Sequence, residues 1–332
     1  MKNFKKVLGF LLRVSISAIL LAVLFSFKQV DVHGLINEIK SADKAFLLLA
    51  FFIFLLMYFL GFLRWQMLLR AVKVNIPLKR VIKSCAGGLF FSLFLPSTVG
   101  GDVARSIDLA RYTQKPKEIV ATVLLDRLSG YVGLVIVILF ALSAGWKMIA
   151  GDVAVLISVG LITGILGAVL LILFNKFLYR QIDKLLHLPN AGKIRTALKS
   201  LFHEIHYFRE HKKILFYNIL ISILIQLLSP LVFYVTALAI GIPVINPVYF
   251  FIFVPIIGAI TLLPISLGGF GLRENTAVIF FAKAGVAGNS AAAMAFLNSI
   301  FILIAGAIGG LIYVLTVRHR RAQYHQTQGI QP

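Results

Sequence analysis

The chain has 332 residues, of which 60% are hydrophobic and only 14% are charged, and its mean hydropathy is +0.95. Soluble domains carry about 25% charged residues, so this composition excludes an ordinary soluble protein. The formal net charge of +21 does not indicate nucleic-acid binding, because the basic residues lie in loops between apolar runs and not on a separate basic domain. We expect an all-α polytopic membrane protein whose loops contact anionic lipid headgroups.

Six apolar segments are long enough to cross a hydrocarbon layer of about 30 Å as helices. The first follows Lys2, Lys5 and Lys6 and could pass for a signal peptide, but its apolar run continues to about Phe27 without a small-residue cleavage site. We therefore interpret it as a retained helix. The predicted spans cover residues 8–27, 45–63, 119–143, 153–174, 214–240 and 290–317.

The loops between these spans differ in charge. Residues 64–83 contain six Lys or Arg and no acid, and residues 175–213 contain nine against three acids. The positive-inside rule places both segments, and both termini, in the cytoplasm of a bacterial or archaeal cell whose inner membrane holds the protein. The segment 175–213 also alternates apolar and basic residues, which is typical of helices lying on an anionic leaflet.

Two further apolar pieces must each begin and end on one side of the membrane if this orientation holds. The first, around residues 84–104, would dip from the cytoplasm as a re-entrant hairpin. The second, around residues 247–284, would dip from outside, although its first arm alone is long enough to span. Because non-helical backbone at membrane depth requires surrounding protein or a water-filled cavity, these hairpins suggest a cavity.

An internal repeat relates the two hairpins. Residues 95–105 (LPSTVGGDVAR) align without gaps on residues 263–273 (LPISLGGFGLR), with five identities in eleven positions. The same shift of 168 residues places the span at 45–63 over the span beginning at 214, and the span at 119–143 over the last one. We therefore predict one integral membrane domain, residues 1–332, with repeat 1 at about 45–143, a cytoplasmic amphipathic linker at about 175–213, and repeat 2 at about 214–317. By the charge rule the two copies have opposite orientations, as in many transporters.

The shared motif carries the candidate headgroup site. Proline and paired glycines should break each helix near the hairpin tip, so that the amides of Gly100, Gly101, Gly268 and Gly269 face an anionic group such as a lipid phosphate. Further on in the two motifs lie two arginines, which would donate to the same phosphate, and two acids, which would balance these charges or bind a cationic headgroup. These four residues are Asp102, Arg105, Arg273 and Glu274. In the other interpretation, Asp102 and Arg105 only lie in a hydrated turn on the cytoplasmic side and bind no headgroup.

Asp126 and Arg127 lie about two turns inside the span that begins at residue 119, where charges are costly. They would contact a headgroup or relay a proton, or form a structural ion pair with Asp102, Arg105 or another helix. Both interpretations are open from the sequence.

No other chemistry is indicated. The single cysteine, Cys85, is expected to be a small packing residue, and no Cys/His cluster has metal-ligand spacing. Four histidines in the linker are expected to be solvated or lipid-facing: His187, His203, His206 and His211. No metal or cofactor is expected. The ATPase pattern GxxxxGK[ST] is missing, so transport would draw on an ion gradient, a partner or the lipid gradient.

The motif GGDVAR at residues 100–105, together with PISLGGFGLRE at residues 264–274, resembles the flippase-like transmembrane family of lysylphosphatidylglycerol synthases. The resemblance covers nearly the whole chain and implies translocation of an anionic or aminoacylated phospholipid, or of a lipid-linked glycolipid, between leaflets. In two-part members a cytosolic domain makes the lipid. This chain ends at Pro332 without such a domain, so we expect no synthase activity, and a separate lipid-synthesising enzyme could be a partner.

From sequence, the favoured function is thus a lipid translocase with a polar cavity between two inverted repeats. The alternative is an integral-membrane transferase for lipid-linked sugars or aminoacyl lipids, with Asp102, Asp126 or Glu274 as acid or base. The absence of an Asp-x-Asp motif and of a nucleotide loop speaks against it. An ion channel would instead show a continuous polar stripe along the spans.

Overall fold

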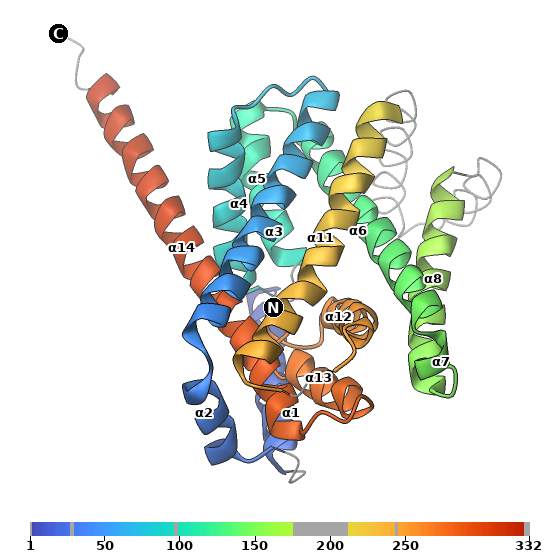
Figure 1. Ribbon diagram of the computed structural model, residues 1–332. Coiled ribbons are helices and arrows are strands. Elements are labelled where there is room, and N and C mark those ends of the chain that lie inside the picture. Colours follow the sequence, from blue (N-terminus) through green and yellow to red (C-terminus); the bar gives the residue numbers. More distant parts are fainter. Residues whose placement is uncertain (1, 27–29, 96–98, 175–211, 243–244, 329–332) are drawn as a thin grey trace.

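The computed structural model describes residues 2–26, 30–95, 99–174, 212–242 and 245–328, and every regular element in these ranges is a helix (Figure 1). The predicted amphipathic linker at 175–213 lies almost wholly outside the described residues. The helices are α1 (Lys2–Ser26), α2 (Val32–Ser41), α3 (Lys44–Ala71), α4 (Leu78–Ser92), α5 (Val99–Thr113), α6 (Pro116–Ala144), α7 (Trp146–Ile149), α8 (Val153–Phe174), α11 (Lys212–Ala239), α12 (Val248–Thr261), α13 (Leu272–Ala282) and α14 (Gly288–Gln328).

Five helices are long and apolar enough to cross a membrane: α3, α6, α8, α11 and α14. Two of them, α3 and α8, begin at an aspartate that caps the helix. The carboxylate of Asp43 accepts from the amides of Ala45 and Phe46 at the start of α3, and Asp152 accepts from two amides at the start of α8. These helices correspond to five of the six predicted spans, and the protein is therefore a polytopic membrane protein. The described apolar part of α1, Leu12–Ser26, is shorter.

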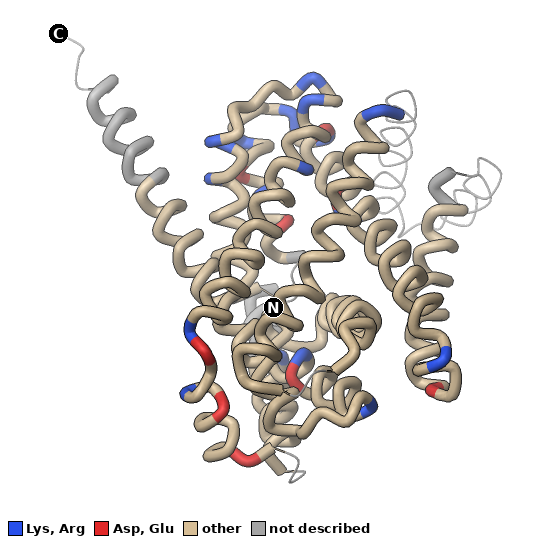
Figure 2. The backbone as a smooth tube through the Cα atoms, viewed as in Figure 1, with Lys and Arg blue, Asp and Glu red and all other residues tan. Residues whose placement is uncertain are grey.

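Charge is distributed unevenly along the bundle. Among the described residues, Lys and Arg gather at the upper end of the view, where α3 ends and where α4, α6 and α11 begin, while most of the described acids outside the bundle interior lie at the lower end (Figure 2). The upper group comprises Arg70, Lys73, Lys79, Arg80, Lys83, Arg111, Lys115, Lys117, Lys212 and Lys213. This distribution matches the asymmetry that the loop charges predicted.

Two groups of four helices, α3–α6 and α11–α14, share the order long, short, short, long. The groups interlock: α3 packs along α11, α14 packs on α4, and α6 packs on α12 as well as on α11. Helix α8 lies at the edge against α6 and α12, and α1 packs against α13 (Figure 1).

The first predicted hairpin is formed by α4 and α5, which pack directly on each other. They lie close together at Gly88 and Gly101, where a Cβ built on Gly101 would lie 2.5 Å from the Gly88 carbonyl oxygen. Gly100 and Gly101 belong to the first turn of α5 and have no positive φ. The expectation that this glycine pair breaks the helix at the tip is therefore wrong for these two residues; their function in the fold is close helix contact.

We predict that Gly101→Ala destabilises the protein by about 1–3 kcal/mol, because the new methyl meets backbone that cannot move away without separating α4 from α5. The measurement is the thermal unfolding midpoint in detergent. Gly164→Ala in α8 is the matched control, since its Cβ would meet nothing within 4 Å. Equal midpoints for the two variants would contradict the prediction.

The second predicted hairpin is formed by α12 and α13, joined by a non-helical segment at residues 262–271. Here the expected break is present: Gly268, Gly269 and Gly271 all have positive φ, at 58°, 85° and 79°, a conformation that suits glycine. Helix α1 covers this segment, because the Ser17 hydroxyl accepts from the Leu267 amide and the Asn275 side chain donates to the Leu20 carbonyl.

Candidate functional site

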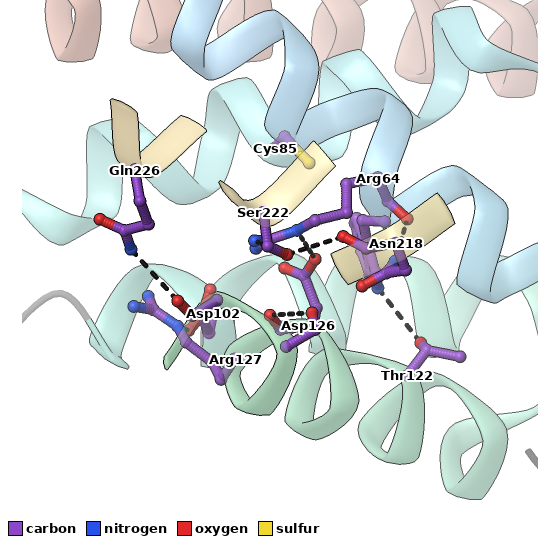
Figure 3. A network of polar contacts seen from close by, with 12 residues as sticks. Arg64, Cys85, Asp102, Thr122, Asp126, Arg127, Asn218, Ser222 and Gln226 are labelled. Atoms are coloured by element: carbon purple, nitrogen blue, oxygen red, sulfur yellow. Dashed lines mark hydrogen bonds and ion pairs between the residues drawn. The ribbon is translucent and has the colours of Figure 1, made fainter. Parts of the chain in front are cut away.

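Asp126 of α6 is the centre of a buried ion-pair network (Figure 3). One carboxylate oxygen lies 2.8 Å from Nε of Arg64 in α3, and the other lies 2.9 Å from Nη2 of Arg105 in α5. Asp126 has only 3% of its surface exposed. Three different helices therefore meet at this carboxylate, and each guanidinium compensates the cost of burying it.

Asp102 extends the network along α5 and back to α6. One of its oxygens pairs with Nη2 of Arg105 at 2.9 Å, and the other accepts from Nε of Arg127. Each charged side chain of the network thus contacts the next in the order Arg64, Asp126, Arg105, Asp102, Arg127. The ion pairs of Asp126 with Arg105 and of Arg127 with Asp102 correspond to the second of the two interpretations left open by the sequence, and a headgroup contact of these residues stays a prediction.

Neutral side chains hold the arginines in place. Arg64 also donates to the Ser222 hydroxyl of α11 at 3.0 Å, and the Asn218 amide donates to the backbone carbonyl of Arg64. The Arg105 guanidinium lies 4.3 Å from the ring centroid of Trp65, whose own indole donates to Thr122. The guanidinium groups are therefore fixed before any ligand arrives.

The network borders a cavity of about 380 Å³ that both groups of helices line. All five charged residues of the network line it, together with Gly101, Cys85, Ser92 and Tyr131 from the first group and Gln226, Ser229, Pro255, Gly258 and Thr261 from the second. Three wall positions of α3, Met57, Tyr58 and Gly61, correspond under the shift of 168 residues to Ile225, Gln226 and Ser229 of α11, which also line it. Equivalent faces of α3 and α11 thus form part of the wall.

The charged pair of the second motif has a different environment. Arg273 donates to the Ser299 hydroxyl at 2.8 Å, and Ser299 donates to Glu274 at 2.6 Å. The other Glu274 oxygen accepts from the Gly271 amide at 2.7 Å and caps α13. Neither these residues nor Gly268 and Gly269 line the cavity described above. Of the ten predicted site residues, the structure gathers Gly101, Asp102, Arg105, Asp126 and Arg127 around that cavity, with Gly100 next to them in the first turn of α5.

Arg64 is the main site residue that the sequence did not indicate. It was counted among the cytoplasmic loop charges after the span at 45–63, whereas α3 continues to Ala71 and buries it. A signal was present: Arg64 and Trp65 are followed by a run (QMLL) with no loop-forming residue. Cys85, expected only to pack, is buried with its sulfur 3.8 Å from Arg105 and lines the cavity.

Within the described ranges, no group of three His, Cys, Asp or Glu side chains is placed to hold a metal ion. The four linker histidines lie outside those ranges.

Two comparisons with known proteins bear on the chain. A search of curated proteins finds no match. Residues 10–310 match the family profile described as the lysylphosphatidylglycerol synthase TM region, a family associated with lipid modification and translocation, and no other domain is found. Because this match covers most of the sequence, the chain belongs to the lysylphosphatidylglycerol synthase transmembrane-region family.

Proposed function

We propose that the protein is a lipid translocase that moves a phospholipid or a lipid-linked headgroup between leaflets of the inner membrane. The observation that carries the proposal is the cavity walled by both helix groups, with five charged side chains on its surface. Charges within membrane helices cost about 2.5–3.5 kcal/mol each on insertion scales, and they commonly mark substrate pathways. The headgroup would occupy this cavity while the acyl chains stay in the bilayer.

Geometry supports a phosphate-bearing headgroup. The cavity wall includes the first turn of α5 at Gly101, where backbone amides lack partners within the helix, so Gly100 and Gly101 would face the phosphate there. Three arginines, each from a different helix, line the same cavity. In this proposal Gly268, Gly269, Arg273 and Glu274 shape the second hairpin, which approaches the cavity through Thr261 and Leu262.

We further propose that α3–α6 and α11–α14 form an inverted repeat, with both termini and the basic end in the cytoplasm. The matched helix order, the reciprocal packing of α14 on α4 and of α6 on α12, and the equivalent wall positions of α3 and α11 support this arrangement. In such proteins one repeat rocks against the other around a central site. The short hairpins α4–α5 and α12–α13 would be re-entrant, and α1 would be the sixth span.

A membrane transferase is less well supported, because it would need an acid or base free to exchange a proton with substrate. Both oxygens of Asp102 and both of Asp126 face guanidinium groups, and Glu274 is fully buried against Ser299 and Gly271. The three candidate acids are thus engaged in the fold.

The test is reconstitution of the full chain into phosphatidylcholine vesicles that carry a trace of fluorescent phospholipid, with dithionite quenching to follow movement between leaflets. We expect movement above that of protein-free vesicles. The proposal is overturned if anionic, zwitterionic and aminoacylated probes all move no faster than in protein-free vesicles.

A further inference from the structure

We infer that the cavity selects headgroups with a net negative charge on phosphate, and that it discriminates against headgroups bearing an added ammonium. This inference rests on the proposed function and narrows its substrate class. It excludes the aminoacylated lipid that the sequence resemblance included among the candidates.

The cavity wall carries an excess of positive charge. Three arginines, Arg64, Arg105 and Arg127, face two aspartates, Asp102 and Asp126, so the five side chains sum to one positive charge. All five are largely buried, with side-chain exposures of 5–30%. Little water screens a charge there, so a phosphate monoanion balances the site and a cationic headgroup adds to its excess.

The carboxylates of the cavity are already paired with arginines, which leaves no oxygen for a cation. An ammonium group would need a carboxylate oxygen, yet each of the four oxygens of Asp102 and Asp126 already contacts an arginine nitrogen, at 2.8–2.9 Å in three of the four cases. Binding a cation would therefore require breaking a charge-assisted pair between fixed side chains. Such pairs are stronger than neutral hydrogen bonds.

Arg105 has a buried hydrogen-bond donor that no described residue uses. Nε of Arg105 is buried and has no hydrogen-bond acceptor among the residues that the structure describes, although Nη1 and Nη2 of the same group contact Cys85 and the two aspartates. Buried donors normally have an acceptor. A small shift of the Arg105 side chain towards an anionic oxygen bound in the cavity would supply one.

Gln226 offers a nearly isosteric way to change the charge of the cavity. From α11, its amide donates to the Gly130 carbonyl of α6, and it belongs to none of the ion pairs of the network (Figure 3). Gln226→Glu adds one negative charge and brings the sum to zero. The matched control is Gln114→Glu, an exposed residue whose amide likewise donates to a carbonyl, that of Arg111.

The experiment compares movement of acyl-labelled phosphatidylglycerol, phosphatidylethanolamine and lysyl-phosphatidylglycerol in phosphatidylcholine vesicles. We expect phosphatidylglycerol to move fastest and lysyl-phosphatidylglycerol to stay at background. We expect Gln226→Glu to lower the ratio of the phosphatidylglycerol to the phosphatidylethanolamine rate by about tenfold or more, and Gln114→Glu to leave it unchanged. Equal or faster movement of the lysylated lipid overturns the inference and leaves the translocase proposal standing.

A binding measurement separates the inference from transport. Short-chain phosphatidylglycerol should raise the unfolding temperature of the detergent-solubilised protein more than the zwitterionic or lysylated lipid does, and Gln226→Glu should remove this difference. If phosphatidylglycerol stabilises the protein selectively but no lipid moves in vesicles, the translocase proposal is overturned and the inference about headgroup selection stands. Equal stabilisation by inorganic phosphate or glycerol phosphate would assign the site to a soluble anion and overturn the lipid assignment.

Discussion

Arg105→Ala is expected to reduce lipid movement by tenfold or more while the protein still inserts and folds. Arg105 bridges Asp102 and Asp126 and stacks on Trp65, so its loss divides the network and removes the excess positive charge of the cavity. Each aspartate keeps one arginine, Asp126 with Arg64 and Asp102 with Arg127. The cost to stability should therefore stay near 1–3 kcal/mol, below that of leaving a buried charge unpaired.

The measurement is the dithionite assay with labelled phosphatidylglycerol, alongside the unfolding midpoint of the same preparation. Arg111→Ala is the matched control, because Arg111 is exposed on the same helix, at the basic end. Arg105→Lys keeps the charge but loses the planar fork that reaches two carboxylates, so it should retain only part of the activity. Full activity in Arg105→Ala would remove the network from the transport mechanism.

Sequence reasoning located the long helices well, because a span is a property of local composition. The bounds predicted for residues 153–174 match α8, and α3, α6, α11 and α14 each contain a predicted apolar run. Two pairs of short packed helices, α4 with α5 and α12 with α13, lie where the two hairpins were predicted, although the glycine pair interrupts the helix only in the second. The prediction missed the polar end of α3, which continues to Ala71 through residues that had been assigned to a loop.

The pairing of charges was only partly predictable, because it depends on helix packing. Asp126 and Arg127 were identified as charges that are costly inside a span, and Asp102 and Arg105 as members of the shared motif. Arg64 joins the network because α3 contacts both α6 and α11. A contact between distant helices leaves no local pattern in the sequence. Under the shift of 168 residues, Asp102 corresponds to Phe270 and Asp126 to Met294, so the proposed second copy lacks the acids that organise the network in the first.

Glu274 illustrates that difference, and Glu274→Ala is expected to lower stability by about 3–5 kcal/mol. Its side chain is fully buried, caps α13 through the Gly271 amide and accepts from Ser299, which in turn accepts from Arg273. Removing the carboxylate leaves the Gly271 amide and the Ser299 hydroxyl without this acceptor, and it removes the negative charge to which Ser299 connects the buried Arg273. The unfolding midpoint in detergent, followed by circular dichroism, measures the loss.

Reactivity of Cys85 offers an independent readout, since it is the single cysteine, is buried, and lies in the other helix group. In Glu274→Ala it should react with a thiol dye at a lower temperature than in the natural protein. Glu118→Ala is the control, because Glu118 is a partly exposed acid in the first turn of α6 whose loss should cost about 0.3–1 kcal/mol. Glu274→Gln keeps the shape and one acceptor oxygen, so its midpoint should lie between those of the natural protein and Glu274→Ala. If Glu274→Ala instead keeps its midpoint and loses lipid movement, this carboxylate contacts the headgroup, and the second motif has the same direct role as the first.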